Sequence, residues 1–224
     1  MIKAVIFDLD NTLLDFISVK KKAVDAAILA MVEAGLNVDA DLARKNIFDI
    51  YDSKGYEYQE VFDDFLTDIH GKIDYKILAS GIVAYRKTKE ASIILYPNVH
   101  STLIKLAKSG YKLAVLSDAP SREAWVRLYS VNLHHLFDVV VTHNDTEKFK
   151  PSPEPFNKAV ELLGIPPKNI IMVGDWPDRD VVGGKLAGMK TAFAKYGDVF
   201  NTESSGADYD LNDISEIFDI VSKT

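Results

Sequence analysis

The sequence predicts an α/β protein, a doubly wound parallel sheet with a bundle of helices inserted after the first strand. Two observations predict it. Apolar residues recur at helical spacing through residues 18–89. After Pro97 the pattern changes to short apolar runs that alternate with helical segments, which is typical of a parallel sheet covered by helices on both faces. We therefore expect a core made of residues 1–15 and 93–224 and an inserted helical domain made of residues 16–92.

The first strand and the inserted helices follow from local patterns. Ala4–Phe7 is a short apolar run and predicts a buried strand. The insertion carries four apolar stripes, and a glycine follows each of the first three where a helix should end. Antiparallel helices joined by short loops would bury these stripes against one another. The stripes lie in residues 19–31, 42–51, 61–69 and 75–85, and the glycines are Gly35, Gly55 and Gly71.

The rest of the chain predicts four more strands and three helices. Asp213 and Glu216 have the spacing of a capping box, which predicts that the last helix begins near Asp213. The other two helices end at Gly110 and Gly164. The predicted strands are residues 111–116, 137–141, 170–173 and 190–194.

Composition excludes several functions. The chain has 224 residues and no Cys, which rules out disulfides, thiolate metal sites and cysteine nucleophiles. Asp and Glu total 33 against 26 Lys and Arg, so we expect no nucleic-acid partner, because nucleic acids require a concentrated basic surface. Asp8 and Asp10 interrupt the first apolar run too early for a signal segment, and no stretch is long enough to span a bilayer. We expect a soluble, cytoplasmic protein with no membrane partner; no pattern indicates its oligomeric state.

Two carboxylates, Asp8 and Asp10, follow the first strand with one residue between them. The period of two in a strand would direct both side chains the same way, at the edge where open parallel sheets bind ligands. Converging carboxylates repel each other unless a cation lies between them, and Mg²⁺ prefers such oxygen ligands. Asp and Asn also mark ordinary turns after strands, so this segment alone fits a metal site and a plain turn equally.

Polar residues follow the other predicted strands as well. The C-terminal ends of parallel strands share one edge, so these side chains should converge. Several acids, a hydroxyl and a lysine in one place are unusual for a structural edge and indicate a catalytic site. The residues expected there are Asp8, Asp10, Thr12, Ser117, Asp118, Lys148, Lys150, Asp175 and Asp180.

Four ordered motifs among these residues resemble the haloacid dehalogenase superfamily, specifically its phosphatases with a C1-type α-helical cap inserted after the first strand. D-x-D-x-T spans Asp8–Thr12, and the second motif is the strand that ends at Ser117. The third is Lys150 with Pro151, and G-D-x-x-x-x-D spans Gly174–Asp180. The resemblance covers nearly the whole chain and implies a Rossmann-like core with a cap.

The resemblance also implies an activity, that of a Mg²⁺-dependent hydrolase of a small, soluble phosphate monoester. Asp8 would be the nucleophile that forms an aspartyl-phosphate, and Asp10 the general acid and base. Mg²⁺ would bind Asp8, the backbone carbonyl of Asp10, and Asp175, with Lys150 as a catalytic cation opposite. The residues that would bind the phosphoryl group are Thr12, Ser117, Asp118 and Lys150.

Some roles stay open at this point. Asp180 fits a metal ligand, a residue that supports the metal ligands from behind, or a helix cap, because Arg179 stands where the family often has Asn. Trp176 either lines the entrance or packs beneath its loop, and Lys148 is expected to be solvated. The alternative functions are a haloacid dehalogenase, a mutase or phosphonatase, and a binding scaffold without catalysis. Asp10 disfavours the dehalogenase, because a halide leaves without a proton.

Overall fold

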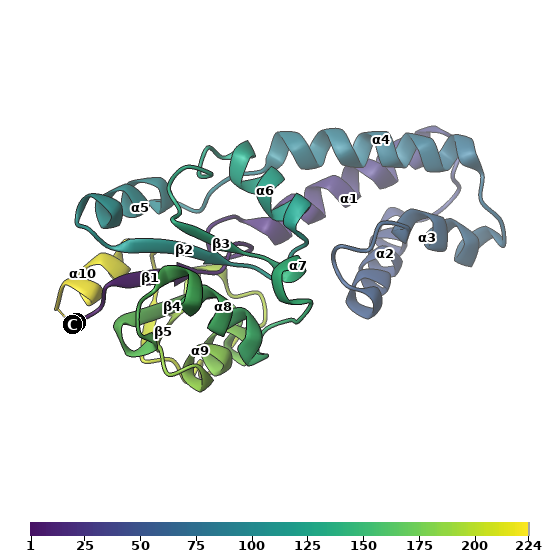
Figure 1. Ribbon diagram of the computed structural model, residues 1–224. Coiled ribbons are helices and arrows are strands. Elements are labelled where there is room, and N and C mark those ends of the chain that lie inside the picture. Colours follow the sequence, from purple (N-terminus) through teal and green to yellow (C-terminus); the bar gives the residue numbers. More distant parts are fainter. Residues whose placement is uncertain (224) are drawn as a thin grey trace. The chain divides into compact units, whose positions relative to one another are not determined.

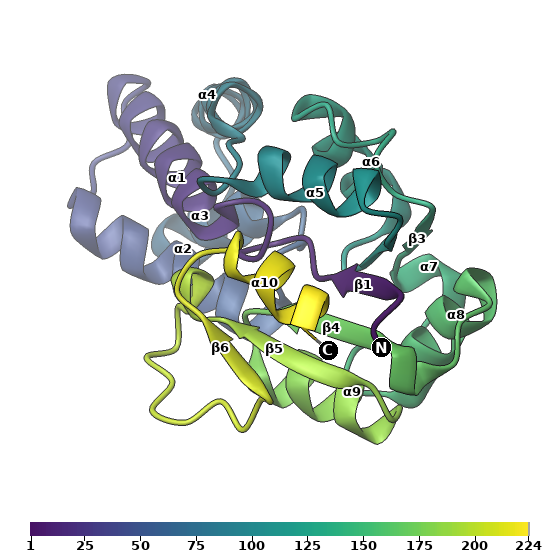
Figure 2. The ribbon, with the colours of Figure 1, turned by 90° about the vertical axis from the view of Figure 1, so that its left-hand side faces the viewer.

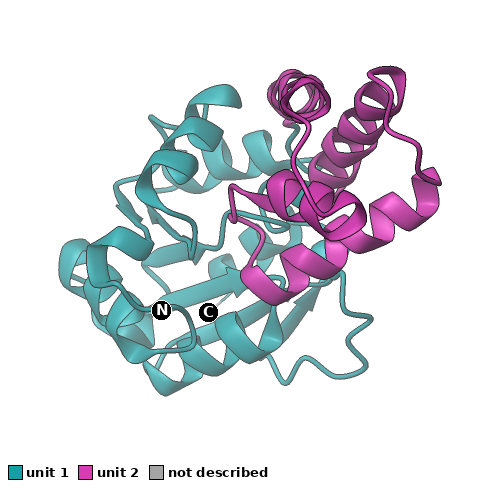
Figure 3. Cartoon of the chain, turned by 90° about the vertical axis from the view of Figure 1, so that its right-hand side faces the viewer, with its two compact units in different colours: residues 1–16, 94–224 teal, residues 17–93 magenta. Residues whose placement is uncertain are grey.

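The computed structural model describes residues 1–223, and the chain forms two compact units (Figure 3). The first, here the core unit, comprises Met1–Phe16 and Ile94–Thr224. The second, here the inserted unit, comprises Ile17–Ile93. Within residues 1–223, no helix combines the length and the apolar character that crossing a membrane requires.

The core unit is built on one sheet of six parallel strands (Figure 1). The strand order β3-β2-β1-β4-β5-β6 puts β1 in the middle, between β2 and β4. This is the order of a doubly wound sheet, and the predicted fold class is confirmed. The strands are β1 (Ala4–Phe7), β2 (Lys112–Leu116), β3 (Val139–Val141), β4 (Ile170–Gly174), β5 (Lys190–Ala194) and β6 (Tyr209–Leu211).

Helices cover both faces of this sheet (Figure 2), which explains why its central strands are apolar throughout. On one face, Ala4 and Ile6 of β1 belong to a buried cluster with Phe156 of α8 (Pro153–Leu163). Elsewhere, α5 (Val99–Lys108) packs against β2 and against α10 (Glu216–Lys223). The remaining core helices and helical turns are α6 (Ser121–Ser130), α7 (His143–Thr146), η1 (Pro167–Asn169), η2 (Pro177–Val181), α9 (Val182–Leu186) and η3 (Lys195–Gly197).

The inserted unit consists of the predicted helices. One buried cluster takes residues from all four, among them Met31, Tyr51, Phe65 and Ile77. This mutual burial is what the four apolar stripes predict. The helices are α1 (Phe16–Glu33), which begins at the last residue of the first core segment, α2 (Ala40–Lys54), α3 (Val61–His70) and α4 (Tyr75–Ser92).

Two elements begin later in the chain than predicted, and others were not predicted. The last helix begins at Glu216, because the Asp213 carboxylate accepts a hydrogen bond from the Ser215 amide (2.8 Å) and closes a turn first. Strand β3 begins at Val139, because the Leu113 amide of β2 donates to the Asp138 side chain (3.0 Å) and not to a backbone carbonyl before Val139. The sequence analysis did not predict helix α6 or strand β6.

The chain leaves and re-enters the core unit through two segments that are hydrogen-bonded to each other. The Asp15 amide donates to the Ile94 carbonyl (3.2 Å), and the Tyr96 amide donates to the Leu13 carbonyl (3.0 Å). Leu14 and Leu95 form an antiparallel bridge between these segments. The insertion is therefore anchored directly after the loop that carries Asp8 and Asp10.

We predict that Phe156→Ala lowers the free energy of unfolding by about 3–5 kcal/mol, because it empties a fully buried site under the sheet. Leu162→Ala, on the same helix but half exposed, is the control and should change it by less than about 1 kcal/mol. Denaturant titration measures both. Equal losses in the two variants would contradict this account of the core.

Candidate active site

The strand order reverses at the centre of the sheet, and the predicted polar residues lie at that point. Asp8 follows β1, and Asp175 follows the neighbouring strand β4. In open parallel sheets, such a reversal leaves a crevice at the C-terminal strand ends, where ligands bind. The Asp8 amide donates to the Val173 carbonyl (2.8 Å), so the sheet ladder itself fixes the position of Asp8.

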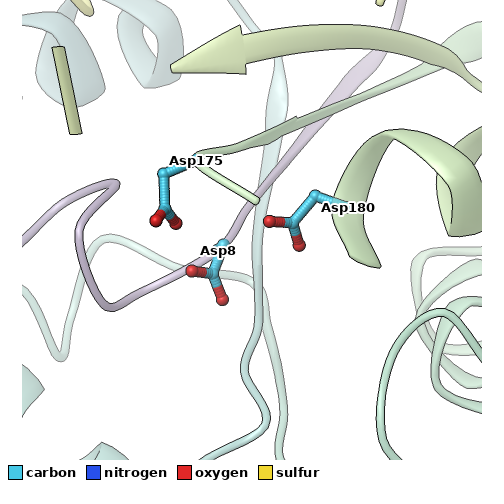
Figure 4. A group of neighbouring side chains, drawn as sticks. All are labelled: Asp8, Asp175 and Asp180. Carbon is cyan, nitrogen blue, oxygen red and sulfur yellow. The ribbon is translucent and has the colours of Figure 1, made fainter. Parts of the chain in front are cut away.

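Three carboxylates meet there. Asp8, Asp175 and Asp180 each present an oxygen within 4.8 Å of the other two, and all three residues are buried. Figure 4 shows the three side chains directed toward one another from separate segments of the chain. We refer to them as the carboxylate cluster. Burial of several like charges is unfavourable unless cations compensate them.

Lys150 supplies one such cation. Its ammonium group donates to Asp8 Oδ1 (2.6 Å), to Asp180 Oδ1 (2.7 Å) and to the Leu116 carbonyl (3.2 Å). Lys150 is only 4% exposed, whereas Lys148 is exposed. The structure therefore places Lys150, and not Lys148, within the cluster.

Burial and charge shift the pKa values of all four groups. Burial raises the pKa of Asp8, while the nearby Lys150 ammonium lowers it in part. Burial and the charges of Asp8 and Asp180 hold the pKa of Asp175 well above its ordinary value. Burial raises the pKa of Asp180 to about 7, against the opposing charge of Lys150. Burial lowers the pKa of Lys150, but the surrounding carboxylates outweigh this and raise it overall.

Asp180 is held by the loop after β4. Its Oδ2 accepts a hydrogen bond from the Trp176 amide (3.1 Å) across the turn η2. A Cβ atom at Gly174 would lie 2.2 Å from the Asp180 side chain, so this position requires glycine. Asp180, itself a member of the carboxylate cluster, thus holds both its own loop and the Lys150 ammonium in place.

Thr12 contacts the cluster through Asp175. The fully buried Thr12 hydroxyl donates to Asp175 Oδ1 (3.2 Å), and Tyr196 donates to the Thr12 carbonyl (2.9 Å). A Cβ atom at Gly197 would come within 1.6 Å of the Asn11 carbonyl oxygen, so the chain after β5 lies directly against the loop after β1. The Thr12 hydroxyl therefore orients the Asp175 carboxylate. The sequence analysis expected Thr12 to bind phosphate and did not predict this contact.

Ser117 and Asp118 follow β2 at the same edge. The Ser117 hydroxyl oxygen accepts from the Ala119 amide (3.1 Å). Asp118 accepts from the Lys150 amide (2.9 Å) and from Arg179 Nη1 (3.0 Å), so its side chain holds the loop of Lys150 in place. A phosphate contact at Asp118 would therefore come from its backbone amide.

Arg179 and Trp176 form an outer layer. The Arg179 guanidinium lies 3.8 Å from the centroid of the Trp176 ring, and Trp176 packs on Phe200 with ring centroids 4.5 Å apart. The Arg179 side chain is about one-third exposed (36%), so it places a cation in contact with solvent next to the cluster. Arg179, which stands where the family often has Asn, thus balances the negative charge of the Asp118 carboxylate.

Asp10 lies outside the carboxylate cluster. Its Oδ2 accepts from Arg127 Nη1 (2.7 Å), and the Asp10 side chain is 22% exposed. Sequence reasoning missed Arg127 because helix α6 was not predicted. A signal existed: Arg127 lies three positions after Ala124 and next to Leu128, on the buried stripe of that helix.

The carboxylate cluster suits a divalent cation. One ammonium group cannot balance three carboxylates, and burial, with a further contribution from neighbouring carboxylates, raises the pKa of both Asp8 and Asp175. Carboxylate oxygens from separate loops are the ligands that Mg²⁺ takes in proteins. The donor set therefore fits a hard divalent metal.

Comparison with known proteins identifies the family. The sequence pattern of the haloacid dehalogenase-like hydrolases matches residues 5–194. The glyceraldehyde 3-phosphate phosphatase of Methanocaldococcus jannaschii is 35% identical over 99% of this chain and 97% of its own length. That of Methanothermobacter thermautotrophicus is 32% identical over 99% of this chain and 100% of its own. The crystal structure of a haloacid dehalogenase-type phosphatase from Thermococcus onnurineus superposes with a TM-score of 0.69 at 26% identity, covering 98% of each chain. This chain belongs to the haloacid dehalogenase-like hydrolase family.

Proposed function

We propose that this protein is a Mg²⁺-dependent phosphatase that hydrolyses a small phosphate monoester through an aspartyl-phosphate. The observation that carries the proposal is the position of Asp8. Its carboxylate lies at the end of the central strand, 2.6 Å from the Lys150 ammonium and within the carboxylate cluster. Family membership and relatives named as phosphatases support the same reaction.

The residues suggest two chemical steps. Asp8 attacks phosphorus, the bond to the ester oxygen breaks, and Asp10 gives a proton to the departing alkoxide. Water then attacks the phosphorus of the aspartyl-phosphate while Asp10 takes a proton from it, which restores both aspartates and releases phosphate. Lys150 keeps Asp8 in place and offsets negative charge as the phosphate approaches.

Asp8 and Asp175 would hold the metal, together with the backbone carbonyl of Asp10. A metal held there would offset the negative charge that the carboxylates and the phosphoryl group bring together. Asp180 already accepts from Lys150 and from the Trp176 amide, so we assign it to holding the lysine and the loop. Ser117 and the amide of Asp118 would donate to the phosphoryl oxygens, and Thr12 would keep Asp175 aligned.

For the substrate, we propose a triose phosphate, with glyceraldehyde 3-phosphate as the first compound to test. The two named relatives cover almost the full chain, so the similarity extends through the inserted unit as well as the core. A dehalogenase is less consistent with the site, because Asp10 is present and held in place by Arg127. A mutase or phosphonatase would use the same core residues, and product analysis separates it from a phosphatase.

The inserted unit is the proposed source of substrate preference. Two contacts hold its turn at Asp52–Tyr58 in place. The Lys20 ammonium donates to the Tyr56 carbonyl (2.5 Å), and the Tyr51 and Tyr56 rings stack with centroids 5.7 Å apart. The paired segments around Leu14 and Leu95 are where the chain leaves and re-enters the core unit. A small backbone change at such paired connections can move an inserted domain as a lid.

We predict that Asp8→Asn lowers kcat by at least about a thousandfold, because an amide retains the shape of the side chain but is not a nucleophile. A screen of phosphate esters with Mg²⁺ measures phosphate release, and circular dichroism checks the fold. Asp178→Asn, an exposed acid of η2, is the control and should keep its activity. Normal turnover by a folded Asp8→Asn variant would refute the assignment.

We predict that excess chelator abolishes activity and that Mg²⁺ restores it. Asp175→Ala should raise the Mg²⁺ concentration for half-maximal activity by at least about tenfold, because the cation loses an oxygen ligand. Asp178→Ala serves as the matched control, since it removes an exposed carboxylate nearby. Undiminished activity in chelator would exclude the metal hypothesis.

We predict that replacing the Asp52–Tyr58 turn with a Gly/Ser segment of equal length changes relative substrate preference. The ratio of kcat/KM for glyceraldehyde 3-phosphate to that for p-nitrophenyl phosphate should change by at least about tenfold. The paired substitution Lys45→Gln, Asp49→Asn on the exposed side of α2 is the control. A constant ratio would assign specificity to core residues such as Trp176 and Arg179.

A further inference from the structure

One buried charge in the core unit has no part in the carboxylate cluster. Arg127 lies on helix α6 and is only 2% exposed. Its Nη1 donates to Asp10 Oδ2 (2.7 Å), and its guanidinium lies 4.5 Å from the centroid of the Phe16 ring. An arginine buried this deeply is costly unless its charge is paired and hydrogen-bonded. Asp10 supplies that pairing, so the buried charge of Arg127 and the position of the Asp10 carboxylate depend on each other.

The contacts of Arg127 restrict both partners. A guanidinium presents its donors in one plane, so a short hydrogen bond from a buried arginine limits where the carboxylate can go. The Phe16 ring limits the guanidinium in turn. Asp10 sits on a loop two residues beyond Asp8, and a loop side chain needs such support to keep a catalytic orientation.

We propose that Arg127 is a positioning residue that sets Asp10 for proton transfer to the leaving group. This inference rests on the proposed phosphatase function and adds a residue to it. In this role Arg127 acts through Asp10 and needs no contact of its own with the phosphorus or the ester oxygen. Because the guanidinium remains charged, it also stabilises the carboxylate that Asp10 becomes once its proton has passed to the alkoxide.

The proposal predicts a dependence on the leaving group. Benzyl phosphate releases an alkoxide that must be protonated, whereas p-nitrophenyl phosphate releases a phenolate that leaves without a proton. The two esters are similar in size, so they place similar demands on the binding site. The parameter to measure is kcat/KM, because it reports the steps up to loss of the leaving group and omits hydrolysis of the aspartyl-phosphate.

The experiment compares wild type, Arg127→Gln, Arg127→Lys and the control Arg122→Gln, all with Mg²⁺. Arg122 lies on the same helix with its side chain 79% exposed. For Arg127→Gln, the ratio of kcat/KM for benzyl phosphate to that for p-nitrophenyl phosphate should fall by at least about tenfold relative to wild type. Arg127→Lys, which keeps the charge but loses the planar fork, should give an intermediate ratio. Arg122→Gln should match wild type.

The outcomes separate the inference from the function on which it rests. If wild type cleaves both esters and the Arg127 variants lose activity on both equally, Arg127 is structural and the inference is wrong, while the phosphatase function stands. Unchanged ratios in folded variants overturn it in the same way. If wild type cleaves p-nitrophenyl phosphate but not benzyl phosphate, no acid is at work and the inference also fails. If wild type cleaves neither ester and also releases no phosphate from glyceraldehyde 3-phosphate, the proposed function fails and the inference falls with it.

Discussion

The Lys150 ammonium group holds together the part of this molecule on which the rest of the site depends. It donates to Asp8 and Asp180 at once and is buried with them. Without that cation, carboxylates from the ends of β1 and β4 would repel each other at the centre of the sheet. With it, two negative charges remain unbalanced when all three acids are ionised, and a divalent metal would satisfy them. The excess of negative charge thus explains both the buried position of the Lys150 ammonium and the expected affinity of the site for a divalent metal.

The acids around the cluster are compensated separately. The Asp118 side chain accepts from Arg179, and the Asp10 side chain accepts from Arg127, so each has a guanidinium partner in addition to the Lys150 ammonium nearby. This separation lets the two proposed roles differ: Asp8 stays beside a cation as a nucleophile, while a different cation orients Asp10. Environments that distinguish neighbouring carboxylates in this way are how one site performs both nucleophilic and acid–base chemistry.

Sequence reasoning predicted the elements whose signals are local. The apolar run Ala4–Phe7, the four helices of the insertion and the parallel sheet are present because burial requires those patterns. Lys150 could be placed near Asp8, 142 positions away, only because parallel strands bring their ends to one edge. Arg127 could not be placed this way, since its contact with Asp10 depends on how helix α6 packs, and no local pattern records that contact. At Asp213 a side-chain hydrogen bond displaced the expected helix start, a competition that spacing alone does not resolve.

The most direct test of the account is to find where the phosphoryl group goes. Asp10→Asn, treated with p-nitrophenyl phosphate and Mg²⁺, should form the aspartyl-phosphate, because this leaving group needs no acid, and should then hydrolyse it slowly, because the base is missing. Acid quenching and mass spectrometry of the peptide that contains Asp8 would locate the group. The account predicts a phosphoryl group on Asp8 itself. Release of one equivalent of p-nitrophenolate with Asp8 unmodified, or with the group on another residue, would contradict it.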